Sequence, residues 1–436
     1  MTFTGEKGKK VAFHTLGCKL NFSETSTISR SFKEKGFNVV DFNTDADIYV
    51  INTCSVTEQA DKKCRQAIKK IQKINDNAFI AVVGCYAQLN PEEIAKNLGV
   101  DLVLGTKEKF NILEHLDSLE KNEIPEIYSC EINDIDQFNS SHSEAGRTRS
   151  FLKVQDGCDY SCTYCTIPLA RGKSRNKSIS ELISEAKKIA ESGIKEVILT
   201  GVNIGDFGRS TNETFFDLLK GLEKVNGIER IRISSIEPNL LKDEIIEHVS
   251  KSTKIQHHFH IPLQSGCNKT LVKMQRRYNR ELFQSRVIRI KELMPDAFIG
   301  VDVIVGFPGE TDTDFNDTYD FLKSLDSSFY HVFSYSERPN TKSASFNDKN
   351  PKHIINERSK ILHKLTEQKL TKFYEQNLGK KAQVLFESSK KNDLIFGFTG
   401  NYIKVETEYN KNLIGEIINV TLESISKSGN VKVKLS

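Results

Sequence analysis

Three cysteines fall within one short stretch of the sequence, in the order C-x3-C-x2-C. They are Cys158, Cys162 and Cys165, and they follow a short apolar run, residues 151–155, that we predict to be a strand. Three thiolates from one loop can bind three irons of a cubane iron–sulfur cluster and leave the fourth iron open to a substrate. A closed zinc site would need a fourth ligand, which this loop does not supply nearby. The spacing therefore favours a redox-active cluster over a structural zinc ion.

Three further cysteines lie far apart in the sequence but occupy equivalent positions. Each follows a short apolar run that we predict to be a buried strand of a parallel sheet. The cysteines are Cys18, Cys54 and Cys85, and the runs before them are residues 10–14, 47–51 and 79–83. Because the carboxyl ends of parallel strands meet along one edge of a sheet, the three thiols could hold a second cluster with one open iron.

A free cysteine can also be simply a small buried hydrophobic side chain. That alternative stays open for the second set, and we prefer it for the three cysteines that share no such position: Cys64, Cys130 and Cys267. The count of nine cysteines is odd, which favours ligands and buried thiols over disulfides.

The middle of the chain repeats a strand followed by a helix. The predicted strands are residues 151–155, 196–200, 230–234, 258–263, 298–305 and 330–334. This repeat predicts a partial (β/α)6 barrel with its functional groups at the carboxyl ends of the strands. Polar or glycine-rich turns at several of these ends predict a lined cofactor site. The candidate contacts are Tyr164, Gly201, Asn203, Ser235, Glu237 and Gln264. A core aromatic at Tyr164 and a plain glycine turn at Gly201 are the alternatives.

The segments on either side of this barrel have different patterns. Before it, short strands alternate with amphipathic helices such as residues 23–34 and 58–74, which is typical of a parallel α/β domain. After a long helical stretch, residues 354–378, the chain becomes rich in β-strand residues separated by Gly and Asn turns. The predicted strands are residues 384–386, 402–406, 413–422 and 431–435. They predict a small antiparallel barrel of the oligonucleotide-binding kind.

The composition is that of a soluble globular protein. Of the 436 residues, 38% are hydrophobic and 28% are charged. The net charge of +4 neither requires nor excludes a nucleic-acid partner. No apolar run reaches the roughly 18 residues needed to cross a bilayer, and residues 1–10 are polar and lysine-rich. The sequence therefore predicts a cytoplasmic protein with no membrane partner.

The six cysteines and their neighbours together resemble the methylthiotransferase family of radical S-adenosylmethionine (SAM) enzymes. The segments that carry the resemblance are residues 15–21, 52–57, 84–88 and 158–172. The resemblance implies an N-terminal methylthiotransferase domain at residues 9–125, a linker at 126–148, a radical SAM core at 149–374 and an RNA-binding domain of the TRAM type at 375–436.

Within this family, the side chains beside the cysteines look most like the branch that acts on N6-threonylcarbamoyladenosine (t6A) at position 37 of tRNA. The resemblance implies radical methylthiolation of carbon 2 of that adenine, which gives ms2t6A. It also implies two 4Fe-4S clusters, one at each cysteine set, and SAM both as methyl donor and as radical source. Because hydrogen would be removed as an atom, no catalytic acid or base is assigned.

The implied partners are the tRNA anticodon loop, whose bases can be splayed out, and an electron donor such as flavodoxin or ferredoxin. The residues expected to hold the RNA backbone are Lys390, Lys391, Tyr402, Lys404 and Lys411. Further candidates for RNA or cofactor contact, with an ordinary basic loop as the alternative, are Arg171, Lys173 and Arg175. The source of the inserted sulfur, the physiological reductant, the tRNAs chosen and the oligomeric state are not predicted.

Other functions stay open on the sequence. The same chemistry could act on isopentenyladenosine in tRNA or on a side chain of a ribosomal protein. A non-catalytic iron–sulfur protein that binds RNA would also carry cysteine ligands, but it would form no 5′-deoxyadenosine from SAM.

Overall fold

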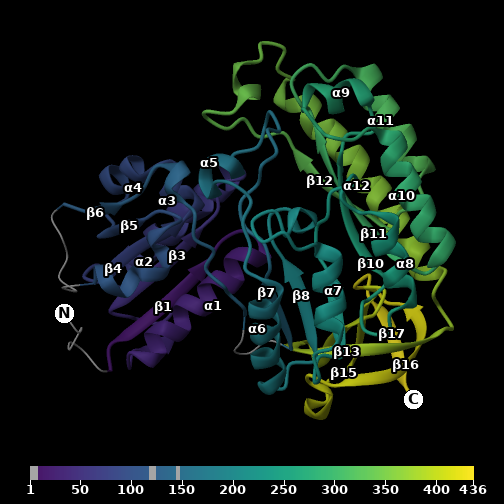
Figure 1. Cartoon of the computed structure of the whole chain (residues 1–436), viewed down its shortest axis with the longest axis horizontal. Helices are drawn as coiled ribbons and strands as arrows, with labels where there is room; N and C mark the ends of the chain where they lie inside the picture. The colour runs from purple at the N-terminus through teal and green to yellow at the C-terminus, as the bar shows by residue number, and fades with distance from the viewer. Residues whose placement is uncertain (1–7, 117–123, 144–147) are drawn as a thin grey trace.

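The computed structural model describes residues 8–116, 124–143 and 148–436 (Figure 1). Predictions that concern residues 1–7, 117–123 and 144–147, in the N-terminus, the first domain and the linker, lie outside the described residues. The described chain forms an N-terminal parallel sheet, a central wall of parallel strands and a C-terminal closed β-barrel. Within these ranges, no helix is both long enough and apolar enough to span a membrane.

The N-terminal sheet has six parallel strands in the order β2-β1-β3-β4-β5-β6. The strands are β1 (Lys10–Thr15), β2 (Asn38–Val40), β3 (Ile48–Thr53), β4 (Phe79–Gly84), β5 (Leu102–Leu104) and β6 (Glu126–Tyr128). Side chains of α2 (Glu58–Ile74) and α4 (Pro91–Leu98) pack on one face, and those of α1 (Lys19–Glu34) pack on the other. From β1 the chain adds β2 on one side and then β3 to β6 on the other, so the order of strands changes sides between β1 and β3. Parallel sheets of this kind bind ligands at the carboxyl ends of the strands beside that point.

Six parallel strands form the central wall, in two sheets with the orders β7-β8-β9 and β10-β11-β12. They are β7 (Arg149–Lys153), β8 (Glu196–Thr200), β9 (Arg230–Ile233), β10 (His258–Gln264), β11 (Phe298–Val305) and β12 (Phe329–Ser334). Two isolated bridges, Ser235 with His260 and Ile231 with Ile255, join β9 to β10. The six strands therefore make one curved wall, the partial barrel that the sequence predicts.

Helices cover the outer face of this wall. The helices of the central part are α5 (Ile167–Arg171), α6 (Ile179–Glu191), α7 (Phe215–Glu223), α8 (Asp243–Lys251), α9 (Asn268–Lys273), α10 (Arg280–Leu293), α11 (Asp312–Ser324) and α12 (Lys352–Glu375). Except for the short α5 and α9, all of them bury apolar side chains against the strands. The capping box predicted at the start of α6 is present, because the Ser178 and Glu181 side chains each bond the other's backbone N–H.

Along each central strand, one residue faces the helices outside the wall and the next faces the barrel interior. The outward-facing residues, such as Ile261 and Val301, belong to the hydrophobic core under the helices. The interior face instead carries many polar and charged side chains, among them Lys153, Glu196, Arg232, His260 and Asp302. An interior lined in this way is not a packed apolar core of the kind that fills a complete parallel barrel.

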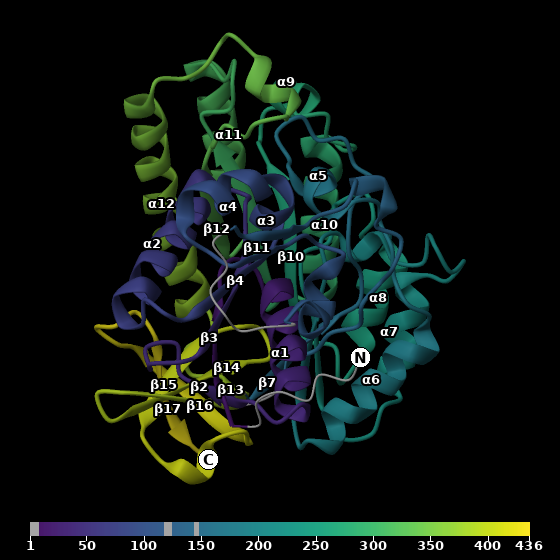
Figure 2. The same ribbon diagram turned by 90° about the vertical axis from the view of Figure 1, so that its left-hand side faces the viewer.

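The C-terminal strands close into a barrel in the order β13-β14-β15-β17-β16. They are β13 (Lys381–Lys391), β14 (Leu394–Thr399), β15 (Lys404–Glu408), β16 (Ile417–Ile425) and β17 (Val431–Leu435). The pair β15 and β17 is parallel, and the other pairs are antiparallel as expected. Figures 1 and 2 both place this barrel at the end of the central wall that is opposite to α9. Arg230 and Arg232 of β9 fix it there by donating to its backbone carbonyls.

Candidate functional site

The loop with Cys158, Cys162 and Cys165 follows β7 and is held at several points by backbone hydrogen bonds. The N–H of Cys158 donates to the carbonyl of Gly172 at 3.0 Å, and that of Thr163 donates to Met274 at 3.1 Å. Gly157 enters the loop with φ +71°, and a Cβ at this position would lie 1.9 Å from a backbone oxygen. Only glycine fits there, so the sequence Gly157-Cys158 sets the start of the loop.

The three thiols of this loop are partly buried and close enough to influence one another. Burial raises the pKa of Cys158 and of Cys165 to about 12, and it also raises the pKa of Cys162. Without a metal ion all three are therefore protonated thiols at neutral pH, and binding of a cluster would release their protons. A cavity of about 630 Å³ lies beside them. Its lining includes the three cysteines, Leu169, Lys173 and Lys342.

The spread of the sulfur atoms separates a cluster from a single ion. A lone zinc ion with Zn–S bonds of about 2.3 Å would bring its sulfurs to about 3.8 Å from one another. Among the described residues, neither cysteine set has all its Sγ atoms within 4.8 Å of one another. Neither set is therefore arranged as the ligands of one tetrahedral ion.

The second cysteine set lies where the sequence places it, at the carboxyl ends of three neighbouring strands. Cys18 follows β1 and caps α1, Cys54 follows β3, and Cys85 begins α3 (Cys85–Leu89) directly after β4. Gly17 has φ +100°, and a Cβ there would lie 2.6 Å from the Cβ of Cys54. The missing side chain therefore allows the first and second strand ends to approach each other.

The second set is also buried, but a cation lies beside it. Burial raises the pKa of Cys54 to about 12, with further contributions from Cys85 and Cys18. Burial raises the pKa of Cys85 as well, while the Arg171 guanidinium opposes that shift. Arg171 comes from α5, directly after the Cys158 loop, so the segment that follows the first cysteine set supplies the cation beside the second.

The six candidate cofactor contacts end up around the carboxyl ends of the central strands. Glu237 forms an ion pair with Arg276, and burial raises the pKa of Glu237 against the effect of this cation. The Tyr164 ring lies edge-on to Phe307, with centroids 6.3 Å apart. Gln264 ends β10 with φ +70°, and Ser235 bridges β9 to β10.

Asn203 and Gly201 differ in what surrounds them. The Asn203 side chain is buried, and neither its amide nitrogen nor its amide oxygen has a hydrogen-bond partner among the described residues. Buried amides of this kind normally have partners, so this one fits a polar ligand such as the amino-acid end of SAM. Gly201 packs against Gln155, where a Cβ would lie 2.8 Å from the backbone oxygen. Close packing between strand ends is therefore enough to explain this glycine.

Comparison with known proteins agrees with this geometry. The family described as "Uncharacterized protein family UPF0004" matches residues 10–105, and the Radical SAM superfamily matches residues 152–322. The threonylcarbamoyladenosine tRNA methylthiotransferase MtaB of Bacillus subtilis (strain 168) is 39% identical over 94% of this chain and 93% of that protein. The same enzyme of Aquifex aeolicus (strain VF5) is 41% identical over 95% of this chain and 100% of that protein. The chain belongs to the radical SAM methylthiotransferase family.

Two more distant similarities concern a methylthiotransferase named for another nucleoside and a solved structure with a similar fold. The tRNA-2-methylthio-N(6)-dimethylallyladenosine synthase of Clostridium botulinum (strain Langeland) is 33% identical over 94% of this methylthiotransferase and 93% of that protein. The solved structure of the radical SAM methyltransferase TsrM from Kitasatospora setae has a TM-score of 0.56 and 14% identity, and the match covers 75% of this chain and 73% of that one. At that identity the similarity concerns the fold alone. The family implies SAM and a 4Fe-4S cluster.

A buried charge network joins the two cysteine-bearing parts of this methylthiotransferase. Glu24 of α1 pairs with Lys109 at 2.7 Å, with Lys153 of β7 at 3.1 Å and with Arg171 at 3.0 Å. Arg171 also pairs with Asp156 at 2.9 Å. All these side chains are almost fully buried. Arg171, Lys173 and Arg175 were candidates for RNA or cofactor contact. Arg171 and Arg175 are buried, and Arg175 pairs with Asp156, so the RNA contact is wrong for these two; Lys173 is exposed.

Two residues that hold candidate site residues in place were not predicted from the sequence. Arg276 donates to the Cys162 sulfur at 3.0 Å and to the Tyr164 hydroxyl at 3.3 Å, while its other nitrogen holds Glu237. Gln155 accepts from the N–H groups of Val202 and Asn203 and so fixes the turn after β8. Arg276 stands in a basic run, Arg276-Arg277, that gave no sign of which arginine turns inward.

Proposed function

We propose that this chain is a tRNA methylthiotransferase that transfers a methylthio group to carbon 2 of t6A at position 37 and forms ms2t6A. Two cysteine sets at strand ends, joined by one buried charge network, support a two-cluster enzyme. The relatives at 39% and 41% identity, both named for threonylcarbamoyladenosine, support the substrate over dimethylallyladenosine, whose enzyme is 33% identical.

In this proposal each cysteine set holds one 4Fe-4S cluster, and SAM lies between the loop cluster and the strand ends. Tyr164, Asn203, Ser235, Glu237 and Gln264 are the candidate SAM contacts, with Gly201 behind them. When bound, these groups supply the hydrogen-abstracting radical and the methylthio group. The protein holds and orients them: Arg276 fixes Glu237 beside the Cys162 sulfur, and Gln155 fixes the turn that carries Asn203.

The terminal barrel is proposed to hold the tRNA backbone through exposed lysines. These are Lys390, Lys391, Lys404 and Lys411. Tyr402 is not part of that surface, because its ring packs between His258 at 4.4 Å and Arg232 at 4.8 Å. The measurement is the affinity for tRNA at several salt concentrations. If these lysines neutralise phosphates, replacing all four by alanine makes the plot of log affinity against log salt less steep, by up to about 0.7–0.9 for each phosphate that is no longer neutralised. Replacing Lys187 and Lys188 on α6 is the control and should leave this slope unchanged.

The direct test is methylthiolation by the anaerobically reconstituted protein, with a chemical reductant standing in for a flavodoxin- or ferredoxin-type donor. Two tRNAs are compared, one with t6A and the other with N6-dimethylallyladenosine at position 37, and the nucleosides are analysed by mass spectrometry. We expect ms2t6A from the first tRNA and little product from the second. Product from the dimethylallyl tRNA alone, or from neither, contradicts the proposal.

A further inference from the structure

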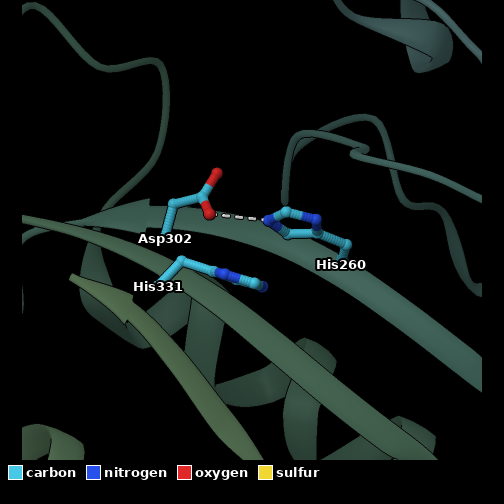
Figure 3. A group of neighbouring side chains, drawn as sticks. All are labelled: His260, Asp302 and His331. Carbon is cyan, nitrogen blue, oxygen red and sulfur yellow. Dashed lines mark hydrogen bonds and ion pairs between the residues drawn. The ribbon is translucent and has the colours of Figure 1, made fainter. Parts of the chain in front are cut away.

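Three side chains of the kind that binds metal ions meet on the interior face of the central wall, one from each of β10, β11 and β12. They are His260, Asp302 and His331 (Figure 3). The Nε2 of His260 lies 2.7 Å from a carboxylate oxygen of Asp302. Each side chain offers one ligand atom, and these atoms all lie within 4.8 Å of one another, which holds for no other such group among the described residues. The proposed function uses none of these side chains.

The register of the three strands explains why these side chains share a face. Asp302 is directly opposite His331 of β12, and His260 is directly opposite Gly300, which lies two residues before Asp302 on β11. Residues two apart on a strand point to the same side of the sheet. Gly300 has no side chain on that side, and the two imidazole rings stack across β11 with centroids 4.9 Å apart. The glycine therefore leaves room for the flanking strands to bring their histidines together.

The group is open to solvent on one side. His260 and Asp302 are partly buried, whereas His331 is exposed. The His331 side chain has no hydrogen-bond partner among the described residues, so its ring can turn. In a tetrahedral zinc site with bonds of about 2.0–2.1 Å, neighbouring ligand atoms are about 3.3 Å apart. The His260–Asp302 pair is already at least as close as this, and a turn of the His331 ring can close the remaining gap.

The charge of the group suits a cation. Two neutral imidazoles and one carboxylate form a ligand set that divalent transition-metal ions prefer. The other charged groups that act on it are Glu237, which is paired with Arg276, and Lys19. Burial lowers the pKa of Lys19 and so disfavours its charged form. The carboxylate of Asp302 is therefore the charge that a bound ion would meet.

A hydrogen-bonded histidine–aspartate pair with no ion is the competing interpretation. In that case His260 donates from Nε2 to Asp302, and His331 does no more than stack on the neighbouring ring. This interpretation leaves the third ligand atom without a role. A metal ion uses all three, because it replaces the proton on Nε2 and binds the lone pair in its place.

We propose that His260, Asp302 and His331 bind one divalent transition-metal ion, for which Zn²⁺ is the probe, at a site separate from both cysteine sets. The ion has three protein ligands. Its remaining positions face the barrel interior, where water or a polar group of a bound molecule completes the coordination. The inference does not depend on which nucleoside the enzyme modifies.

The test adds zinc to protein whose cysteine sets already hold their clusters. The reconstituted protein is incubated with a slight excess of Zn²⁺ and desalted, and zinc and iron are then counted by elemental analysis. We expect about one zinc per chain in the wild-type protein, with the iron content unchanged. His331→Leu and Asp302→Asn should each lower the zinc affinity at least about 100-fold, since even the loss of a group that only supports a ligand costs about 10–100-fold.

The identity of the zinc ligands is measured by X-ray absorption at the zinc edge. We expect only nitrogen and oxygen neighbours, at about 2.0–2.1 Å. Sulfur neighbours at about 2.3 Å would place the zinc on cysteines and overturn the inference. This measurement needs no variant and no enzymatic activity, so it remains decisive if a variant does not fold or if the proposed substrate is wrong.

A matched control is available elsewhere on the molecule. His257 lies 3.3 Å from Asp296 in another histidine–aspartate pair, which has no third ligand within reach among the described residues. His257→Gln should bind zinc as the wild-type protein does. Added zinc should raise the midpoint of thermal unfolding in both of these proteins but not in His331→Leu. Zinc binding that is absent from the wild-type protein, or equal in the wild-type protein and His331→Leu, would overturn the inference in favour of the hydrogen-bonded pair.

Discussion

The two cysteine sets contain the same number of thiols but are built differently. Cys158, Cys162 and Cys165 lie on one loop whose backbone bonds and Gly157 fix it locally. Cys18, Cys54 and Cys85 come together only because β1, β3 and β4 are neighbours in a sheet. The first site is encoded by spacing, whereas the second is encoded by topology. Assembly of the second set therefore depends on the stability of the whole N-terminal sheet.

The largest expected effect is on the loop set. In the triple variant Cys158→Ala, Cys162→Ala, Cys165→Ala, we expect both 5′-deoxyadenosine formation from SAM and methylthiolation to fall to background, because the family's radical chemistry needs this cluster. Bound iron should fall by about half, and the thermal unfolding of the protein should change little. Residual SAM cleavage by this variant would contradict the assignment of the loop.

Loss of the second set should separate the two activities. In Cys54→Ala we expect no methylthio product, but reduced protein should still cleave SAM, since the loop set is intact. Cys64→Ala is the matched control, because Cys64 is fully buried in α2 among apolar side chains and belongs to neither set. It should lose about 1 kcal/mol of stability and keep both activities. If Cys54→Ala and Cys64→Ala lost equal activity, Cys54 would not differ from a buried cysteine outside the cluster sets, and its assignment as a cluster ligand would be contradicted.

The network between the two sets should contribute more to stability than any exposed ion pair. Glu24→Gln leaves Lys109, Lys153 and Arg171 without their shared anion, and breaking a buried network of this kind costs about 3–5 kcal/mol. The control is Glu92→Gln, whose partner Lys96 is exposed and whose loss should cost under about 0.5 kcal/mol. The midpoint of the first thermal unfolding transition measures both; equal midpoints would contradict the role of the network.

The same network has a pH dependence of definite sign. Burial alone would raise the pKa of Glu24, but Arg171, Lys109 and Lys153 together lower it; Lys153 and Arg171 lower that of Asp156 in the same way. Both carboxyls therefore contribute stability that is fully present above their usual pKa near 4 and is lost as the pH falls below it. In Glu24→Gln the loss of stability below pH 4 should be smaller than in the wild-type protein.

The smallest expected effect concerns Arg276, which links Glu237 to the loop set. Removal of its N–H bond to the Cys162 sulfur should make the loop cluster harder to reduce, since hydrogen bonds to cluster sulfurs raise the potential. In Arg276→Gln we expect a lower reduction potential by redox titration and roughly tenfold slower SAM cleavage, about 1.4 kcal/mol. Arg289→Gln, in an exposed pair with Glu247, should change neither quantity.

The parts of the site that lie close together in sequence could be predicted, and the parts that connect distant segments could not. The Cys158 loop and the six central strands follow directly from spacing and apolar runs. The helix α1 begins at Lys19, whereas the sequence predicts its start at Ser23. The prediction misses the beginning of the helix because this part buries polar side chains such as Asn21 and Glu24, which break the apolar pattern. Their burial is explained by the charge network. Arg276 and Gln155 act through tertiary contacts, which a single sequence does not reveal.

The central claim is that the protein holds two separate clusters. Anaerobic reconstitution followed by iron and sulfide analysis tests it most directly, carried out on the wild-type protein and on Cys54→Ala. The account predicts about eight irons and eight sulfides per wild-type chain and about four of each in the variant. About four irons in the wild-type protein, unchanged in Cys54→Ala, would contradict it.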